Sequence, residues 1–264
     1  MATSALRPRK ASEIVDAAFQ ILKAHYSQFV MCSALAYLPW LVLELLWIGD
    51  PEKLAGRLAN PDGGPGAAWL IGLMAGIGVW LTFALMSAVI MTCASQAYLG
   101  ETVDVAGAVR RALPRLPRVM LAAVLRYILL VVGFMCFLVG ALYVAARFFA
   151  LTPTIILEDA SLSQAFSRTS VLSDGRKQHI LSTLGLVAII YWVIAAGVSI
   201  LSALSGNFVL QVVFGAFYTI LAYPVIAITE CLLYYDARIQ SEGLDIELMA
   251  QELGAVAPTE PANR

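Results

Sequence analysis

Long apolar segments limit what this chain can fold into more strongly than any short motif in it. A helix needs about 20 mainly apolar residues to cross the hydrocarbon core of a bilayer. Segments of that length or longer cover Tyr26–Ile48, Trp69–Met91, Val119–Leu157, Ile180–Leu204 and Phe208–Tyr235. The third is long enough for two helices with a tight turn near Gly140, or for one span followed by a re-entrant segment. We therefore predict an all-α membrane bundle of about six transmembrane helices.

The composition agrees with a polytopic membrane protein. Hydrophobic residues make up 60% of the 264 residues and charged residues 13%, with a mean hydropathy of +0.81. Soluble domains are about 45–50% apolar and about 25% charged. The formal net charge of −1 does not favour binding to nucleic acid, so we expect no such partner.

The basic residues are concentrated on one side of the predicted spans. The opposite side carries only Lys53 and Arg57, in the loop 49–67. Lysine and arginine favour the cytoplasmic side of a membrane, so we predict cytoplasmic termini in a multi-pass protein of the cell inner membrane. The segments on that side hold thirteen of the 17 Lys and Arg residues: Arg7, Arg9, Lys10, Lys23, Arg110, Arg111, Arg115, Arg118, Arg168, Arg176, Lys177, Arg238 and Arg264.

Three short segments before pairs of spans share one pattern. They are "ASEIVDAAF" (11–19), "ETVDVAGAV" (101–109) and "EDASLSQAF" (158–166). Aligned without gaps, they share a potential N-cap residue and one apolar helical face. The N-cap residues are Ser12, Thr102 and Asp159, and the apolar positions are Val15, Ala18 and Phe19, Val105, Ala108 and Val109, and Leu162, Ala165 and Phe166.

This pattern predicts three parallel repeats, each an interfacial amphipathic helix followed by a helical hairpin. The alternative is that any amphipathic helix shows such spacing. The repeat units would cover about 11–99, 100–157 and 158–235 of a single membrane domain, 1–253. The last residues, 254–264, are predicted to be a disordered tail because they are rich in proline and small residues.

Four stretches carry a resemblance to a known family. They are "RPRKASEIVDAAFQILKAHY", "YLGETVDVAGAVRRALPRLPRVM", "LYVAARFFALTPTIILEDASLSQAFSRTSVL" and "LLYYDARIQSEGLDIELMA". Together they resemble the membrane domain named after glycerophosphoryl diester phosphodiesterases, over roughly residues 7–250. The resemblance implies a prokaryotic cytoplasmic-membrane protein of about six helices without an established activity. The family often has Pro-Gly before the fourth span, where this chain has Val139-Gly140.

The residues do not favour an enzyme. Phosphodiester hydrolysis of the kind in the family name needs a soluble barrel with histidines and carboxylates around a divalent metal. This chain has no room for such a barrel, and its histidines are His25 and His179. Its cysteines lie far apart in the sequence, each in an apolar segment, so we expect no metal site and no cofactor. They are Cys32, Cys93, Cys136 and Cys231.

Four ionisable residues fall inside predicted spans and are the candidate ligand-binding residues: Glu44, Arg126, Arg147 and Glu230. Such charges usually face a protein interior or a cavity. At 1.5 Å per residue, Arg126 and Glu230 lie roughly 11 and 8 Å deep and could pair. Arg147 lies roughly 15 Å deep and Glu44 beyond roughly 20 Å, a poorer match.

Arg147 has a further possible partner, because Pro153 lacks an N–H and frees the carbonyl of Phe149. One interpretation of these charges is a polar centre for an anionic ligand or a lipid head group. The other is a set of internal pairs that fixes helix packing.

Two functions fit these observations. The first is a non-enzymatic membrane protein that binds or translocates a lipid or another anionic small molecule. The second is a scaffold or assembly factor that docks a partner through its cytoplasmic helices and acidic tail.

The stretch "LLYYDARIQSEGLDIELMAQEL" (232–253) predicts a structural motif at the end of the last span. Tyr234 and Tyr235 would lie at the cytoplasmic membrane interface, and the helix would continue towards Gly243. Arg238 would pair with Asp236, Glu230 or Glu158. The segment would pack on the interfacial helices near Arg110 and Arg111 or Arg168.

Overall fold

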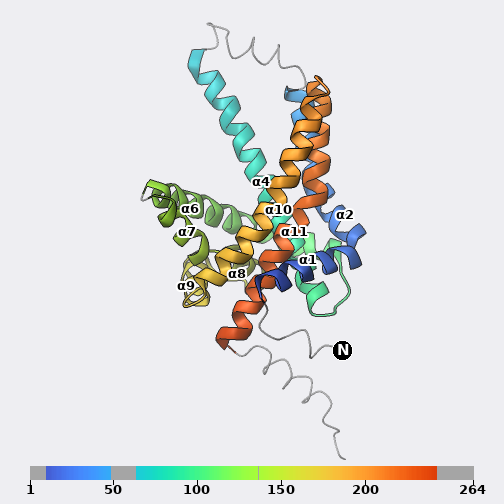
Figure 1. The fold of residues 1–264 in the computed structure, drawn as a ribbon. Helices are drawn as coiled ribbons and strands as arrows, with labels where there is room; N and C mark the ends of the chain where they lie inside the picture. Colours follow the sequence, from blue (N-terminus) through green and yellow to red (C-terminus); the bar gives the residue numbers. More distant parts are fainter. Residues whose placement is uncertain (1–9, 49–63, 136, 243–264) are drawn as a thin grey trace, which may run out of the picture.

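The computed structural model describes residues 10–48, 64–135 and 137–242 (Figure 1). The described residues form helices and no strand. The elements are α1 (Ala11–Ala24), α2 (Tyr26–Ile48), α4 (Gly64–Tyr98), α5 (Val105–Ala112), the 3₁₀ turn η2 (Leu113–Arg115), α6 (Leu116–Met135), α7 (Phe137–Arg147), α8 (Leu151–Leu157), α9 (Leu162–Leu172), α10 (Lys177–Ala203) and α11 (Phe208–Glu242).

Six helical segments are long and apolar enough to cross a membrane, which confirms the all-α, multi-pass fold class. They are Tyr26–Leu45, Gly72–Tyr98, Val105–Met135, Phe137–Leu157, Lys177–Ala203 and Phe208–Glu242. The predicted tail 254–264 and the loop residues Lys53 and Arg57 lie outside the described residues.

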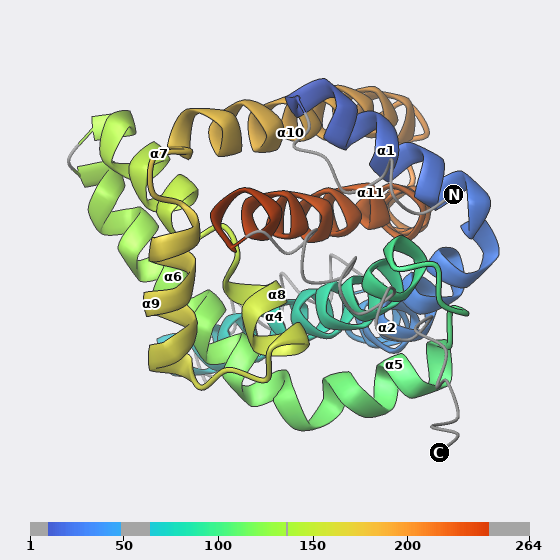
Figure 2. The ribbon, with the colours of Figure 1, turned by 90° about the horizontal axis from the view of Figure 1, so that it is seen from below.

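Helix α11 lies at the centre of the arrangement. Seen from below in Figure 2, α10 and α1 lie on one side of it and α4 and α2 on the other, and α11 contacts all four. The helices α1, α5, α8 and α9 gather at one end of the bundle, which we call the α1 end. The turn between α10 and α11 lies at the opposite, far end (Figure 1).

The buried core is concentrated towards the α1 end. Residues 86–96 of α4 are buried there, as are most of residues 224–239 of α11, and Tyr234 is 0% exposed. Towards the far end α4, α10 and α11 expose large apolar side chains, among them Leu73 of α4 and Trp192 and Leu201 of α10. Such surface is stable when lipid covers it, so the exposed helices are compatible with contact to the bilayer.

The reversal between α6 and α7 differs from the expectation. Helix α6 ends at Met135 and α7 begins at Phe137, which has a φ of +63°, whereas the predicted turn was near Gly140. Gly140 instead lies inside α7, facing Gly133 of α6. A Cβ added to Gly133 would lie 2.8 Å from the carbonyl carbon of Gly140. The glycine pair therefore serves the close approach of two helices, not the turn itself.

The three predicted interfacial segments all contain helices: α1, α5 and α9. Each helix buries the shared alanine completely, since Ala18, Ala108 and Ala165 are all 0% exposed. The first apolar position of each segment is buried or half-buried, as the shared pattern requires. The repeat relationship itself stays a prediction.

The predicted N-caps were wrong. The observed N-cap residues are Lys10, Asp104 and Ser161 in place of Ser12, Thr102 and Asp159. A side-chain oxygen accepts the backbone N–H at each observed cap, and it comes from Glu13, Gln96 and Gln164 respectively. These acceptors fix the helix starts.

Asp159 has a different role from the predicted cap. Its Oδ1 accepts hydrogen bonds from Arg115 Nε and Arg118 Nη2, both at 2.9 Å. These bonds join the segment before α9 to the start of α6. Hydrogen bonding by Arg115 first, and then by Arg118, lowers the pKa of Asp159 below its usual value.

Candidate functional site

The end of α11 forms a network of ion pairs with the segment around α9. Tyr234 Oη donates to Glu158 Oε1 at 2.7 Å, and Arg168 Nε donates to Glu158 Oε2 at 3.0 Å. Arg168 Nη2 also donates to Glu242 Oε2 at 2.9 Å. Arg238 completes the set, which we call the Glu158 network: Glu158, Arg168, Tyr234, Arg238 and Glu242.

Arg238 lies between the two acids of this network. Its Nε is 3.0 Å from Glu242 Oε2 and 3.9 Å from Glu158 Oε1. Glu158 was one of the three predicted partners, but the shorter contact, to Glu242, was not predicted. Hydrogen bonding by Glu158 raises the pKa of Arg168 above its already high value, so that cation stays charged. Two acids and two bases balance, which indicates a structural role.

Neighbouring residues of the motif reach different helices. Tyr235 Oη lies 2.6 Å from Ser95 Oγ of α4, and its ring stacks on Tyr98 at 4.9 Å between centroids. Asp236 is 3% exposed, and its Oδ2 lies 3.3 Å from Nε2 of His179 near the start of α10. The end of α11 therefore holds α4, α9 and α10 together.

Two of the four predicted intramembrane charges meet. Arg126 Nη1 of α6 lies 3.7 Å from Glu230 Oε1 of α11, so the predicted pair is present. The distance is longer than a hydrogen bond. The side chains are 31% and 15% exposed, so this is a loose pair inside the bundle.

Arg147 lies elsewhere than predicted. It is the last residue of α7, near the α1 end, and its Nη1 donates to Tyr143 Oη at 2.9 Å. Lys177, the first residue of α10, places its Nζ 5.5 Å from the centroid of the same tyrosine ring. Arg147 does not bond the carbonyl of Phe149. Pro153 lies in the first turn of α8, where backbone N–H groups lack helical partners in any case.

Glu44 is separate from the other three charges. It lies on α2 and accepts a hydrogen bond from Trp40. Within the described residues, neither Glu44 nor Arg147 forms an ion pair with an oppositely charged side chain. The structure therefore does not assemble the four residues into one polar centre.

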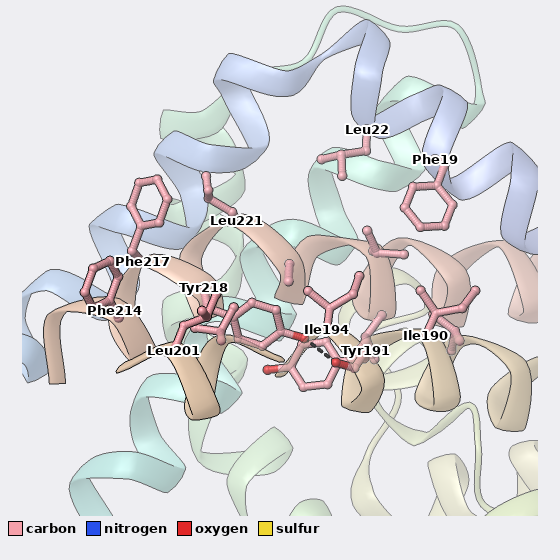
Figure 3. A pocket seen from close by; sticks show the side chains of 15 residues that line it. Phe19, Leu22, Ile190, Tyr191, Ile194, Leu201, Phe214, Phe217, Tyr218 and Leu221 are labelled. Atoms are coloured by element: carbon pink, nitrogen blue, oxygen red, sulfur yellow. Dashed lines mark hydrogen bonds between the residues drawn. The ribbon is translucent and has the colours of Figure 1, made fainter. Parts of the chain in front are cut away.

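The structure shows instead an apolar groove that we did not predict. It has a volume of about 600 Å³ and lies between α1, α10 and α11 (Figure 3). Aliphatic and aromatic side chains make up its walls: Phe19, Leu22, Val187, Ile190, Tyr191, Ile194, Val198, Leu201, Phe214, Phe217, Tyr218, Leu221, Ala222, Val225 and Ile226.

The polar atoms of the groove are largely engaged. Tyr218 Oη donates a hydrogen bond to the backbone carbonyl of Tyr191. The two rings lie 5.1 Å apart between centroids. Because the tyrosine that reaches across the α10–α11 pair is already bonded, the groove offers an occupant mainly apolar contacts.

Comparison of the chain with known protein families, with curated protein sequences and with solved structures finds no match. The geometry of the described residues must therefore carry the functional argument. Within those residues, no group of three or more histidine, cysteine or acidic side chains could hold a metal ion. Cys32 and Cys93, distant in the sequence, do lie with their sulfur atoms 3.5 Å apart.

No sequence signal marked the groove. Its α10 wall is formed by Val187, Ile190, Ile194, Val198 and Leu201. Other residues of α10, such as Ile189 and Val193, are equally apolar but do not line it, and exposure does not separate the two sets, since Leu201 of the wall is 70% exposed. A helix that is apolar on every face does not show by periodicity which face lines a cavity.

Proposed function

We propose that this chain is a multi-pass membrane protein that binds the acyl chain of an amphipathic lipid in the apolar groove between α1, α10 and α11. The observation that carries the proposal is the groove itself. Its volume of about 600 Å³ lies within the usual range for small-molecule sites, about 300–1,000 Å³. Its lining suits an alkyl chain better than a polar solute.

The shape of the groove supports an extended occupant. The wall on α10 runs from Val187 to Leu201, about 21 Å at 1.5 Å per residue. The hydrocarbon core is about 30 Å thick. An acyl chain in the groove would therefore lie along α10, parallel to the acyl chains of the surrounding lipids.

The position of α1 supports a lipid with a head group at that end. Phe19 and Leu22 of α1 cover one end of the groove, and the next residue, Lys23, is exposed. An amphipathic helix of this kind lies at the level of the head groups. Lys23 is then placed to meet an anionic head group.

We infer that the α1 end faces the cytoplasm, since most of the lysines and arginines among the described residues lie there. The four stretches that resemble the membrane domain named after glycerophosphoryl diester phosphodiesterases imply an inner-membrane location, which is part of this proposal. The proposed function is binding without catalysis. Tyrosine hydroxyls are the only ionisable groups of the groove lining, and they do not form the acid–base pairs that hydrolysis uses.

The experiment is native mass spectrometry of the purified full-length protein, titrated with a phosphatidylglycerol of defined chain length. Ile194→Trp and Val198→Trp fill the groove and should each lower the retained lipid at least fivefold. Ile189→Trp and Val193→Trp are matched controls, because these apolar positions of α10 lie outside the groove lining. Equal retention by groove and control variants would contradict the proposal.

A further inference from the structure

The tip of the α6–α7 hairpin is the most exposed apolar part of the described chain. Met135 and Phe137 on either side of the turn are 80% and 85% exposed. Phe134, Leu138 and Val139 are 66%, 61% and 75% exposed. A turn that projected into water would expose these five large side chains together, which soluble surfaces rarely do.

The sequence of the hairpin contains nothing that suits a turn in water. Between Tyr127 and Tyr143 stand the residues "ILLVVGFMCFLVGAL", without a charged, amide or hydroxyl side chain. The turn between α10 and α11 provides the comparison within the same chain. It is Ser205-Gly206-Asn207, and Asn207 Oδ1 accepts the backbone N–H of Leu210 at 3.2 Å.

One arm of the hairpin, α7, is too short to cross the bilayer; the other, α6, has 20 residues, about 30 Å, but in Figure 1 it runs across the direction of α10 and α11. Helix α7 has 11 residues, about 16 Å at 1.5 Å per residue, against a hydrocarbon core of about 30 Å. In Figure 1 the turn between α6 and α7 lies far below the turn between α10 and α11. Helix α10, by contrast, has 27 residues, about 40 Å.

Both bases of the hairpin are held at the α1 end by polar contacts. At the start of α6, Arg118 bonds Asp159. At the end of α7, Arg147 bonds Tyr143, whose ring also lies beside Lys177. Arginine, lysine and tyrosine are the side chains that settle at a membrane interface. The glycine contact between α6 and α7 then lets the two helices return side by side without a polar loop.

We propose that α6 and α7 form a membrane-embedded hairpin that enters and leaves the bilayer at the α1 end, with its turn among the lipid acyl chains. The partner of the exposed tip is thus the hydrocarbon interior, not water on the far side and not another protein. Length and composition alone make Val105–Met135 and Phe137–Leu157, the segments that contain α6 and α7, candidate spans. The position of the turn distinguishes the two topologies. The inference does not depend on lipid binding in the groove.

The test uses single cysteines in the full-length protein, with its four native cysteines replaced by alanine and the protein reconstituted in liposomes. Leu138→Cys reports on the hairpin turn, and Gly206→Cys on the α10–α11 turn. A maleimide that dissolves only in water should label Gly206→Cys at least tenfold faster, with reagent supplied to both faces. A thiol in hydrocarbon does not form the reactive thiolate. Labelling of Leu138→Cys within threefold of Gly206→Cys would overturn the proposal.

A second measurement reports depth without relying on thiol reactivity. A nitroxide attached at Leu138→Cys should relax strongly with oxygen, which is concentrated in hydrocarbon, and weakly with a water-soluble nickel chelate. The same label at Gly206→Cys should show the reverse order. Val139→Cys, 75% exposed, replaces Leu138→Cys if that variant does not fold. Dominant relaxation by the nickel chelate at the hairpin position would refute the embedded turn.

Discussion

Replacing Glu158 by alanine should destabilise the protein more than the same change at the other acid of the Glu158 network, Glu242. Glu158 accepts a hydrogen bond from Tyr234, whose side chain is fully buried, and it pairs with Arg168. The change to alanine would leave the buried hydroxyl of Tyr234 without the carboxylate that accepts its hydrogen bond. Arg168 would keep only Glu242 as an acidic partner.

The size of the effect follows from these two losses. A hydrogen bond from a neutral donor to a charged group contributes about 1.5–3 kcal/mol. The ion pair with Arg168 is partly exposed, at 30% and 22% for the two side chains, so water screens it and it adds only about 0.5–1 kcal/mol. The expected loss is therefore about 2–4 kcal/mol. At about 2–4 °C per kcal/mol, the Tm should fall by roughly 4–16 °C.

The assay is thermal unfolding of the detergent-solubilised protein, followed by circular dichroism and by the loss of monodispersity. Glu242→Ala is the matched control, because Glu242 contacts only arginines in this network and should cost about 1 kcal/mol. Glu158→Gln keeps an acceptor oxygen for Tyr234, so its loss of stability should lie between those of Glu158→Ala and Glu242→Ala. A Glu158→Ala variant no less stable than Glu242→Ala would refute the assigned role of the Tyr234–Glu158 bond.

Two further changes test other contacts. Hydrogen bonding by Arg115 lowers the pKa of Asp159, so the stabilising contribution of this carboxylate is present above the usual pKa of about 3.9 and is lost as the pH falls through the lower folded value. Asp159→Asn should therefore lower the Tm at pH 7, and the difference in Tm from wild type should narrow below about pH 4. A difference in Tm that stays constant with pH would contradict this. Gly133→Leu should force α6 and α7 apart, since a Cβ there meets the Gly140 backbone at 2.8 Å. The overpacking should lower the free energy of unfolding by roughly 1–3 kcal/mol. A Tm within 1 °C of wild type would argue against the close contact.

The features that the sequence predicts correctly depend on the length of an apolar segment or on a charged residue within one. The second helix begins and ends at Tyr26 and Ile48, as the apolar run predicts. The last helix continues to Glu242, because no proline or glycine interrupts it after the span. The pairing of Arg126 with Glu230 followed from their similar depth.

The features that the sequence does not predict correctly depend on where a helix is interrupted and on which of its faces meets a neighbour. A pattern of apolar residues shows neither. The depth of Arg147 was estimated along a continuous helix, but the helix ends at that residue and α8 begins at Leu151. The break places Arg147 close to the start of α10. The groove was not predicted for a related reason, since the positions of α10 that line it and those that do not are equally apolar.

The Glu158 network also affects the order in which the protein can be assembled. Glu158 and Arg168 lie on the N-terminal side of two long helices, whereas Tyr234 and Arg238 lie at the end of the second. During synthesis from the N-terminus, the first pair must wait while α10 and most of α11 are made and inserted. Until then Glu158 has Arg168 as its partner in the network. The network therefore closes only when the last helix is in place, and a chain that stops before Tyr234 leaves Glu158 without its contacts to α11.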